Sequence, residues 1–171
     1  IPPCKIWLSD KETRQADQLT DNLAGKTWLA IGPGANWRRK IWESEKFATT
    51  TNSLKKEFDG VIIIGSPRDA EYSRKTAEKL ILPYVDLTGR TDILTAAAIL
   101  KKCSLFIGND SGLGHLASAV KTPSITVFGQ GIPERYHPWS KKNLWFRGKD
   151  KSLETLDAET VIHGALELIH S

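Results

Sequence analysis

The feature that most constrains the fold is a regular alternation of short apolar runs with segments of helical character. The run at residues 61–64 is Val-Ile-Ile-Ile, which suits a strand buried on both faces of a parallel sheet. Strands that alternate with helices indicate βαβ units. We therefore expect an α/β fold, a Rossmann-like parallel sheet with helices on both faces.

The expected elements fill the chain from end to end and leave no visible interdomain linker, so residues 1–171 are expected to form a single domain. Ser9 and Glu12 have the spacing of a capping box at the start of the first helix. The loop at 129–138 is rich in glycine, proline and polar groups, and is a candidate lid or acceptor-side wall. Strands are expected at 27–31, 61–64, 104–107, 124–128 and near 144–146, and helices at 10–24, 43–58, 70–80, 93–102, 113–121 and 157–169.

Composition excludes several classes of protein. The 24 basic and 20 acidic residues give a net charge of +4 without a long block of one sign, so no nucleic-acid partner is expected. No apolar run approaches the length of about 18 residues that spans a membrane, and no secretory signal is recognisable. Cys4 and Cys103 lie far apart without metal-ligand spacing, and Cys103 has an apolar context. We expect a buried Cys103 thiol, a reducing cytoplasm and no metal site.

The chain contains no methionine and begins at Ile1. We therefore expect it to be part of a longer protein.

A turn at residues 108–115, Gly-Asn-Asp-Ser-Gly-Leu-Gly-His, joins an expected strand to an expected helix. Its glycines let the backbone approach a ligand, and the first amides of the helix are free to bind a phosphate. Ser111 adds a hydroxyl donor, Asp110 is expected to accept from sugar hydroxyls or to orient His115, and His115 faces the same anion. The turn therefore predicts a site for the diphosphate of a nucleotide-linked donor. An ordinary helix cap formed by Asp110 or Ser111 explains the same residues equally well.

A second group of candidate residues follows the strand at 27–31. A glycine turn at 32–34 leads into Arg38, Arg39 and Lys40. Cations beside a diphosphate neutralise the charge of the leaving group, with Lys40 as a point charge and the two arginines as a clamp. A solvated basic loop anchored by Trp42 is the alternative. The segment has neither the spacing of a P-loop nor the third glycine of a dinucleotide fingerprint.

Gly89-Arg90-Thr91-Asp92 precedes another expected helix. Backbone groups here would contact a nucleotide base, because this loop enters a helix at the same sheet edge. The alternative is that Asp92 is the N-cap of the helix and nothing more.

Taken together and in order, these segments resemble glycosyltransferase family 9, the heptosyltransferases of the lipopolysaccharide inner core. The central match is Asp-Ser-Gly-Leu-Gly-His-Leu-Ala-x-Ala at 110–119, followed by Pro123 and by Phe128-Gly129. The flanking matches are Lys40-x-Trp42, the segment 89–94 and Pro133-x-Arg135-x-x-Pro138.

The resemblance implies the C-terminal, donor-binding domain of an inverting GT-B glycosyltransferase, which transfers heptose from ADP-heptose to a lipopolysaccharide core acceptor. The donor-binding residues would be Asn36, Lys40, Thr91, Asp110, Ser111, Gly112 and His115. No cofactor is implied beyond the ADP-heptose substrate. The general base and the binding site for the lipid-linked saccharide acceptor would lie in an N-terminal domain absent from this chain, so the chain alone would bind donor without catalysis. The protein would work in the cytoplasm, at the inner face of the inner membrane.

Two departures from the family pattern bear on the choice of ligand. Residues 35–37 are Ala-Asn-Trp where small hydroxyl residues are common, and Pro67 occupies the stretch where well-known members carry an acidic ribose-binding residue. A domain that uses another nucleotide sugar and a non-catalytic nucleotide-binding module therefore remain as alternatives.

Overall fold

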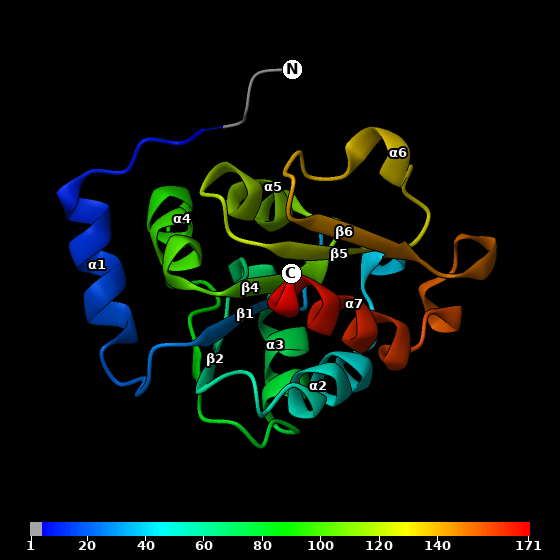
Figure 1. The fold of residues 1–171 in the computed structure, drawn as a ribbon, viewed down its shortest axis with the longest axis horizontal. Coiled ribbons are helices and arrows are strands. Elements are labelled where there is room, and N and C mark those ends of the chain that lie inside the picture. Colours follow the sequence, from blue (N-terminus) through cyan, green and yellow to red (C-terminus); the bar gives the residue numbers. More distant parts are fainter. Residues whose placement is uncertain (1–4) are drawn as a thin grey trace.

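The strands form one six-stranded parallel sheet in the computed structural model, which describes residues 5–171 (Figure 1). The strand order is β3-β2-β1-β4-β5-β6, and each neighbouring pair is parallel. This confirms the expected Rossmann-like sheet, with β1 and β4 side by side at its centre. The strands are β1 (Trp28–Gly32), β2 (Gly60–Ile63), β3 (Tyr84–Asp86), β4 (Leu105–Asn109), β5 (Ser124–Phe128) and β6 (Asn143–Arg147).

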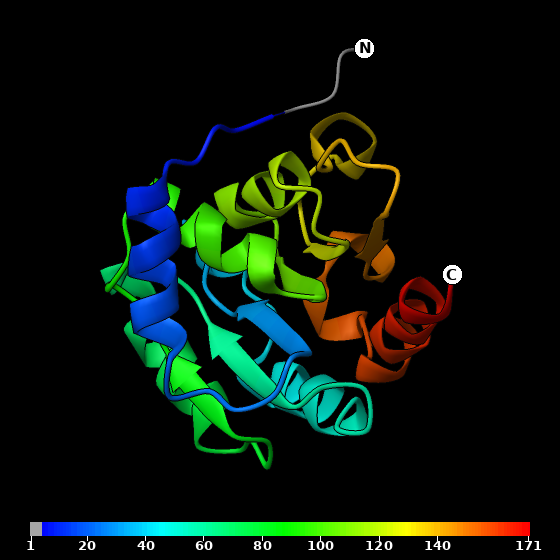
Figure 2. The same cartoon turned by 60° about the vertical axis from the view of Figure 1, so that its left-hand side comes forward.

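Helices cover both faces of the sheet, as the alternating pattern predicts (Figures 1 and 2). On one face lie α1 (Asp10–Thr20), α4 (Ile93–Lys102) and α5 (Gly112–Ala119). On the other face lie α2 (Ser44–Ser53), α3 (Ala70–Ala77) and α7 (Ala158–His170). The short α6 (Pro133–Tyr136) lies within the segment expected to be a loop after β5. Short 3₁₀ helices span Arg38–Lys40, Pro67–Asp69, Lys149–Lys151 and Leu153–Thr155.

The central strands β1 and β4 are apolar at every position except the last one of β4, Asn109, because both of their faces are buried. Successive residues of a strand point to opposite faces. Leu29 and Ile31 pack beneath α2, α3 and α7, whereas Ala30 and Ile62 pack beneath α1, α4 and α5. The run at 61–64 therefore needs no alternation with polar residues.

Helix starts agree closely with the sequence signals. The capping box at Ser9 is confirmed, because its backbone N–H donates to Glu12 Oε2 at 2.8 Å and its hydroxyl oxygen accepts from the Lys11 N–H. Asp92 caps α4 by accepting from the Thr95 N–H at 2.7 Å, and Asp157 caps α7 by the same kind of bond. Short polar side chains thus fix where three helices begin.

Helix ends depart further from expectation. The first helix ends at Thr20 rather than near 24, because Asp21 and Asn22 are poor helix formers. The second ends at Ser53 rather than near 58. Residues 54–57 continue as hydrogen-bonded turns, and the side chain of Asn52 donates to the Lys79 carbonyl and accepts from the Ile81 N–H.

Cys103 is a buried thiol, as expected from its apolar context. Its exposed fraction is 6%, and its Sγ donates to the Ile99 carbonyl. Burial raises the pKa of this thiol to about 12, so it stays protonated and unreactive at neutral pH. Cys4 lies outside the described residues.

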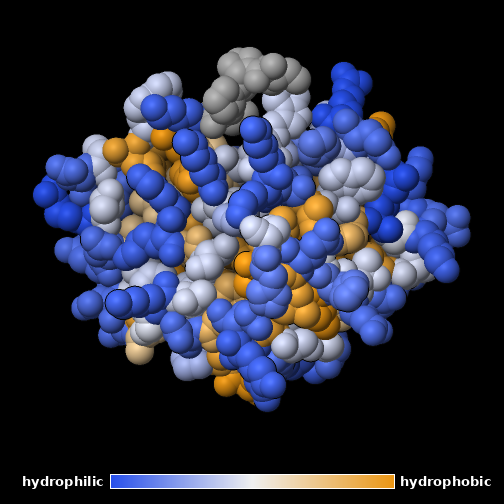
Figure 3. All heavy atoms as spheres, viewed as in Figure 1, coloured by the Kyte–Doolittle hydropathy of each residue, from blue (hydrophilic) through white to orange (hydrophobic). Residues whose placement is uncertain are grey.

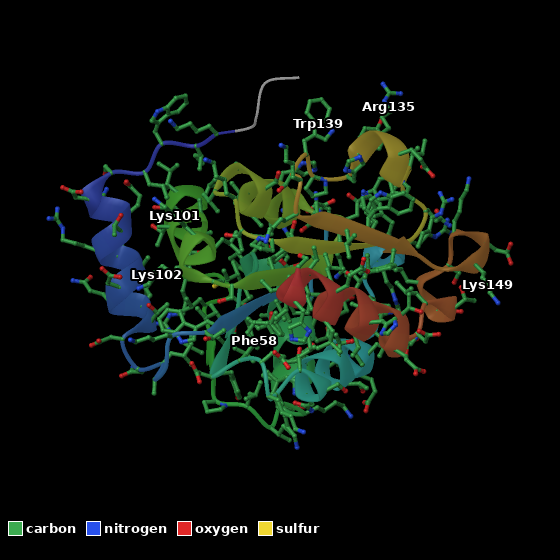
Figure 4. All side chains as sticks on the ribbon, in the orientation of Figure 1. Phe58, Lys101, Lys102, Arg135, Trp139 and Lys149 are labelled. Carbon is green, nitrogen blue, oxygen red and sulfur yellow. The ribbon has the colours of Figure 1, made fainter. Side chains whose placement is uncertain are left out.

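The surface carries charged side chains and several aromatic ones, among them Trp37, Tyr136 and Trp139. The face in Figure 3 is largely hydrophilic with apolar patches between the charged groups. Lys102 extends from α4 to Asp17 on α1, and Trp139 and Arg135 point outward from the segment after β5 (Figure 4). Among residues 5–171, no helix is long and apolar enough to cross a membrane.

Asp59 ties the start of β1 to the start of β2 and makes stability depend on pH. Its carboxylate accepts from the Lys26 and Thr27 N–H groups at 2.8 and 3.0 Å, and these bonds hold its pKa below the ordinary value of 3.8. A lowered pKa stabilises the fold above the unfolded-state pKa, and that contribution is lost as pH falls through the folded-state value. Urea midpoints should therefore fall below about pH 4, less steeply in Asp59→Asn than in the unsubstituted chain. Parallel pH profiles for the two would contradict this role.

Candidate functional site

The candidate site lies where the sheet topology reverses. The chain leaves the carboxyl end of β1 toward α2 on one face, and leaves the adjacent β4 toward α5 on the other. The two connections diverge and leave a crevice beyond the strand ends, which is where open α/β sheets bind ligands. Residues 34–36 of the loop after β1 form one wall, and Ser111 and Gly112 after β4 form the other.

A cleft of about 380 Å³ occupies this position. Four of the expected donor-binding residues line it: Asn36, Thr91, Ser111 and Gly112. Apolar side chains from the starts of α4 and α5, among them Ile93, complete the wall. A mostly apolar cleft of this size with a few polar groups is typical of sites for small ligands.

The start of α5 presents unused hydrogen-bonding groups to the cleft. Ser111 is the N-cap residue with extended backbone, but its side chain makes no capping bond. Its Oγ is buried and has no partner among the residues that the structure describes. The alternative of an ordinary cap by Asp110 or Ser111 is therefore wrong. Free amides, a free hydroxyl and the positive end of the helix dipole together favour an anion here.

Lys40 and Asp110 join the loops after β1 and β4 by an ion pair. Lys40 Nζ lies 2.6 Å from Asp110 Oδ2, and the side chains are 30% and 11% exposed. The Asp110 carboxylate packs against Gly131. A Cβ at position 131 would lie only 2.9 Å from Asp110 Oδ2, so a larger residue there would clash with the carboxylate. The expectation that Asp110 orients His115 is wrong in this structure, because the carboxylate binds Lys40 instead. His115 is exposed on the first turn of α5, outside the lining of the cleft.

Asn109 was not predicted as a site residue, yet it connects the end of β4 to the loop that follows β1. Its side chain is completely buried at the end of β4. Its Nδ2 donates to the carbonyls of Pro33 and Gly34 at 2.9 and 3.2 Å, and its Oδ1 accepts from the Trp42 N–H at 2.9 Å. The available signal was a polar residue in the last, buried position of an apolar strand.

An acidic side chain does line the cleft, although Pro67 stands where the resemblance implies one. Asp69 lines the cleft and closes a capping box with Ser66. Its carboxylate accepts from the backbone N–H of Ser66 at 2.7 Å. Gly34 packs directly against it, because a Cβ at 34 would lie 2.1 Å from Asp69 Cγ. Only glycine at 34 lets the two loops approach this closely.

Arg38 and Arg39 do not line this cleft, and the Lys40–Asp110 ion pair also lies outside its lining. The two arginines line a separate cleft of about 930 Å³ together with Tyr72 and Lys75 of α3. The larger volume alone does not make this the principal site, since four of the seven candidate donor residues line the smaller cleft. The expected arginine clamp on the same diphosphate is therefore not supported by this arrangement. Within residues 5–171, no group of three or more His, Cys, Asp or Glu side chains is arranged to hold a metal ion.

The sheet order and the cleft at its reversal point define a Rossmann-like α/β ligand-binding domain. The family model described as glycosyltransferase family 9 (heptosyltransferase) matches residues 2–165. The chain belongs to this family.

Curated relatives and solved structures agree with that assignment. Lipooligosaccharide heptosyltransferase 2 of Haemophilus influenzae is 29% identical over 153 residues, which are 83% of this chain and 44% of the relative. Lipopolysaccharide heptosyltransferase 3 of Escherichia coli is 31% identical over 70% of this chain and 36% of its own length. The chain thus spans less than half the length of these two relatives.

The fold is shared with solved heptosyltransferases. The ADP-heptose lipopolysaccharide heptosyltransferase II of E. coli superposes with a TM-score of 0.84 at 23% identity, over 97% of this chain and 53% of that one. E. coli heptosyltransferase WaaC, solved with ADP, gives a TM-score of 0.75 at 22% identity, over 90% of this chain and 48% of that one.

Proposed function

We propose that this chain is the donor-binding domain of an inverting glycosyltransferase, which transfers heptose from ADP-heptose to a lipopolysaccharide core acceptor. Family membership supports the class of reaction, and the similarity to lipooligosaccharide and lipopolysaccharide heptosyltransferases supports heptose and lipopolysaccharide. The observation that carries the proposal is the cleft at the β1–β4 reversal, where the start of α5 offers free amides and the free Ser111 hydroxyl. That set of groups suits a nucleoside diphosphate.

Each part of the cleft suits one part of the donor. The apolar wall around Thr91 and Ile93 would receive adenine. Ser111 and the amides at Gly112 would hold the diphosphate, with Lys40 beside them as its cation. Asn36 lines the same cleft, and Asp110 and His115 would lie on the side of the sugar.

The remaining parts of the reaction are assigned to a second domain. Because the chain spans less than half the length of the two heptosyltransferase relatives named above, we propose that residues 1–171 are the donor half of a GT-B enzyme. The general base and the site for the lipid-linked acceptor would belong to the other half, so no catalytic residue is assigned to this chain. The enzyme would act in the cytoplasm at the inner face of the inner membrane, where its acceptor lies.

Calorimetric titration of the chain with ADP, UDP and GDP tests the proposal. ADP is expected to bind most tightly, because the proposed donor is an ADP-sugar. Tighter binding of UDP or GDP would favour another nucleotide sugar, and no binding of any of the three would overturn the donor site. Binding of ADP without transfer from ADP-heptose by a protein that includes the second half would favour a non-catalytic module.

Gly112→Val gives a sharper test of where the nucleotide binds. A Cβ at position 112 would meet no atom of another segment within 4 Å, so a side chain there has open space beside α5. The isopropyl group would occupy the space that a phosphate needs against the helix amides. ADP affinity should fall by about tenfold or more, which corresponds to one lost charge-assisted hydrogen bond. An unchanged affinity together with an unchanged melting temperature would place the nucleotide elsewhere.

A further inference from the structure

Asn109, the last residue of β4, binds the loop that follows β1 and immediately precedes Asp110. We propose that Asn109 is a positioning residue of the donor site. Through its side-chain hydrogen bonds it holds the segment 33–42 in the conformation that brings Lys40 to Asp110 and Asn36 to the cleft. The inference rests on the proposed function for its ligand, and on hydrogen-bond geometry for its mechanism.

The three bonds reach both ends of that segment. Pro33 and Gly34 lie at its beginning and Trp42 at its end, and none of the three belongs to a helix or strand. Their backbone groups therefore cannot be satisfied by regular secondary structure, and Asn109 supplies the partners inside the protein. Between the two ends lie Asn36 and Lys40, so one buried side chain sets the position of both.

Only a carboxamide matches these partners. It offers one acceptor oxygen and two N–H donors in one plane, which bind the Trp42 N–H and the two carbonyls. An aspartate would keep the acceptor but place an oxygen against two carbonyl oxygens. An alanine would leave all three backbone groups buried without partners.

A positioning role and a purely structural role of Asn109 predict different effects on the binding of ADP and of adenosine. If Asn109 acts through Lys40, its loss should weaken ADP much more than adenosine, because adenosine has no diphosphate for Lys40 to contact. For the same reason the substitutions at 109 and 40 should not be additive. A general loss of stability would weaken both ligands alike and would add to the effect at 40.

The experiment combines calorimetry with amide hydrogen exchange on the whole chain. Asn109→Ala and the isosteric Asn109→Asp are compared with Thr122→Val. Thr122 is a matched control, because its buried hydroxyl donates to the Leu100 carbonyl at 2.7 Å at the opposite end of the sheet. Hydrogen exchange is followed at 33–42 in the ligand-free protein, and affinity is measured for ADP and adenosine with and without Lys40→Ala.

Both Asn109 variants should exchange faster at 33–42 and bind ADP about tenfold or more weakly, with a smaller loss for adenosine. In the Lys40→Ala background their further effect on ADP should shrink to the size of their effect on adenosine, and Thr122→Val should change neither quantity. Unchanged exchange at 33–42, or equal and additive losses for both ligands, would overturn the inference. If the unsubstituted chain binds no ADP, the proposed function fails, while exchange in the ligand-free variants still decides whether Asn109 holds the segment. Should Asn109→Ala not fold, the shape-conserving Asn109→Asp supplies the same comparisons.

Discussion

Lys40→Ala is expected to weaken ADP binding by about a hundredfold, equivalent to about 2.7 kcal/mol. Two effects act in the same direction. The diphosphate loses a cation, and Asp110 keeps a negative charge that no longer has its partner at 2.6 Å. Because the Asp110 side chain is only 11% exposed, water screens this charge poorly, and it repels an approaching diphosphate. Calorimetric titration with ADP measures the loss.

The double variant Lys40→Ala/Asp110→Asn separates the two effects. It removes the uncompensated carboxylate, so about tenfold of the lost affinity should return. Lys79→Ala is the matched control, since Lys79 is a surface lysine whose ion pair with Glu45 lies away from the cleft. Its ADP affinity should match that of the unsubstituted chain. An affinity of Lys40→Ala within about twofold of the unsubstituted chain, which is less than any charge-assisted bond contributes, would remove Lys40 from the site.

Local signals predicted most of the fold because the strands and helix starts are encoded locally. The β-branched run at 61–64 and the caps at Ser9 and Asp92 act within a few residues of themselves. The edge strand Tyr84–Asp86 escaped prediction because it has three residues, none of them fully buried. Its pairing with β2 is a tertiary contact that its own composition does not reveal.

The site was predictable as a list of residues but not as a set of contacts. The turn at 108–115 and Lys40 could be selected because their residue types suit a diphosphate. The pairing of Lys40 with Asp110 joins residues 70 positions apart, and the bonds of Asn109 join residues 67 to 76 positions apart. Such contacts depend on which strands are neighbours. The same reason explains why three consecutive cations have different surroundings: Arg38 and Arg39 line the larger cleft, whereas Lys40 pairs with Asp110.

Trp42 is the residue through which the site loop depends on the core. Its side chain is fully buried, its ring lies edge-on to Phe47 at 5.2 Å, and its Nε1 donates to the Leu156 carbonyl at 3.0 Å. Its backbone N–H is the group that Asn109 accepts from. One residue thus joins the end of the segment 33–42 to α2, to the segment before α7 and to β4.

Trp42→Ala is therefore expected to cost about 4–5 kcal/mol of unfolding free energy, from the cavity left by the ring and the orphaned Leu156 carbonyl. For a domain of this size that is about a third to a half of the total stability, and the melting temperature should fall by about 10 °C or more. Trp42→Phe keeps the aromatic contact and loses the donor, so it should cost less. Trp7→Ala removes an indole that is 76% exposed and should change stability by no more than about 0.5 kcal/mol. Urea denaturation measures all three. Equal stabilities for Trp42→Ala and Trp7→Ala would show that the site loop does not depend on this anchor. A loss confined to Trp42→Ala and Trp42→Phe would show that the loop carrying Lys40 is held by the same core that holds the sheet.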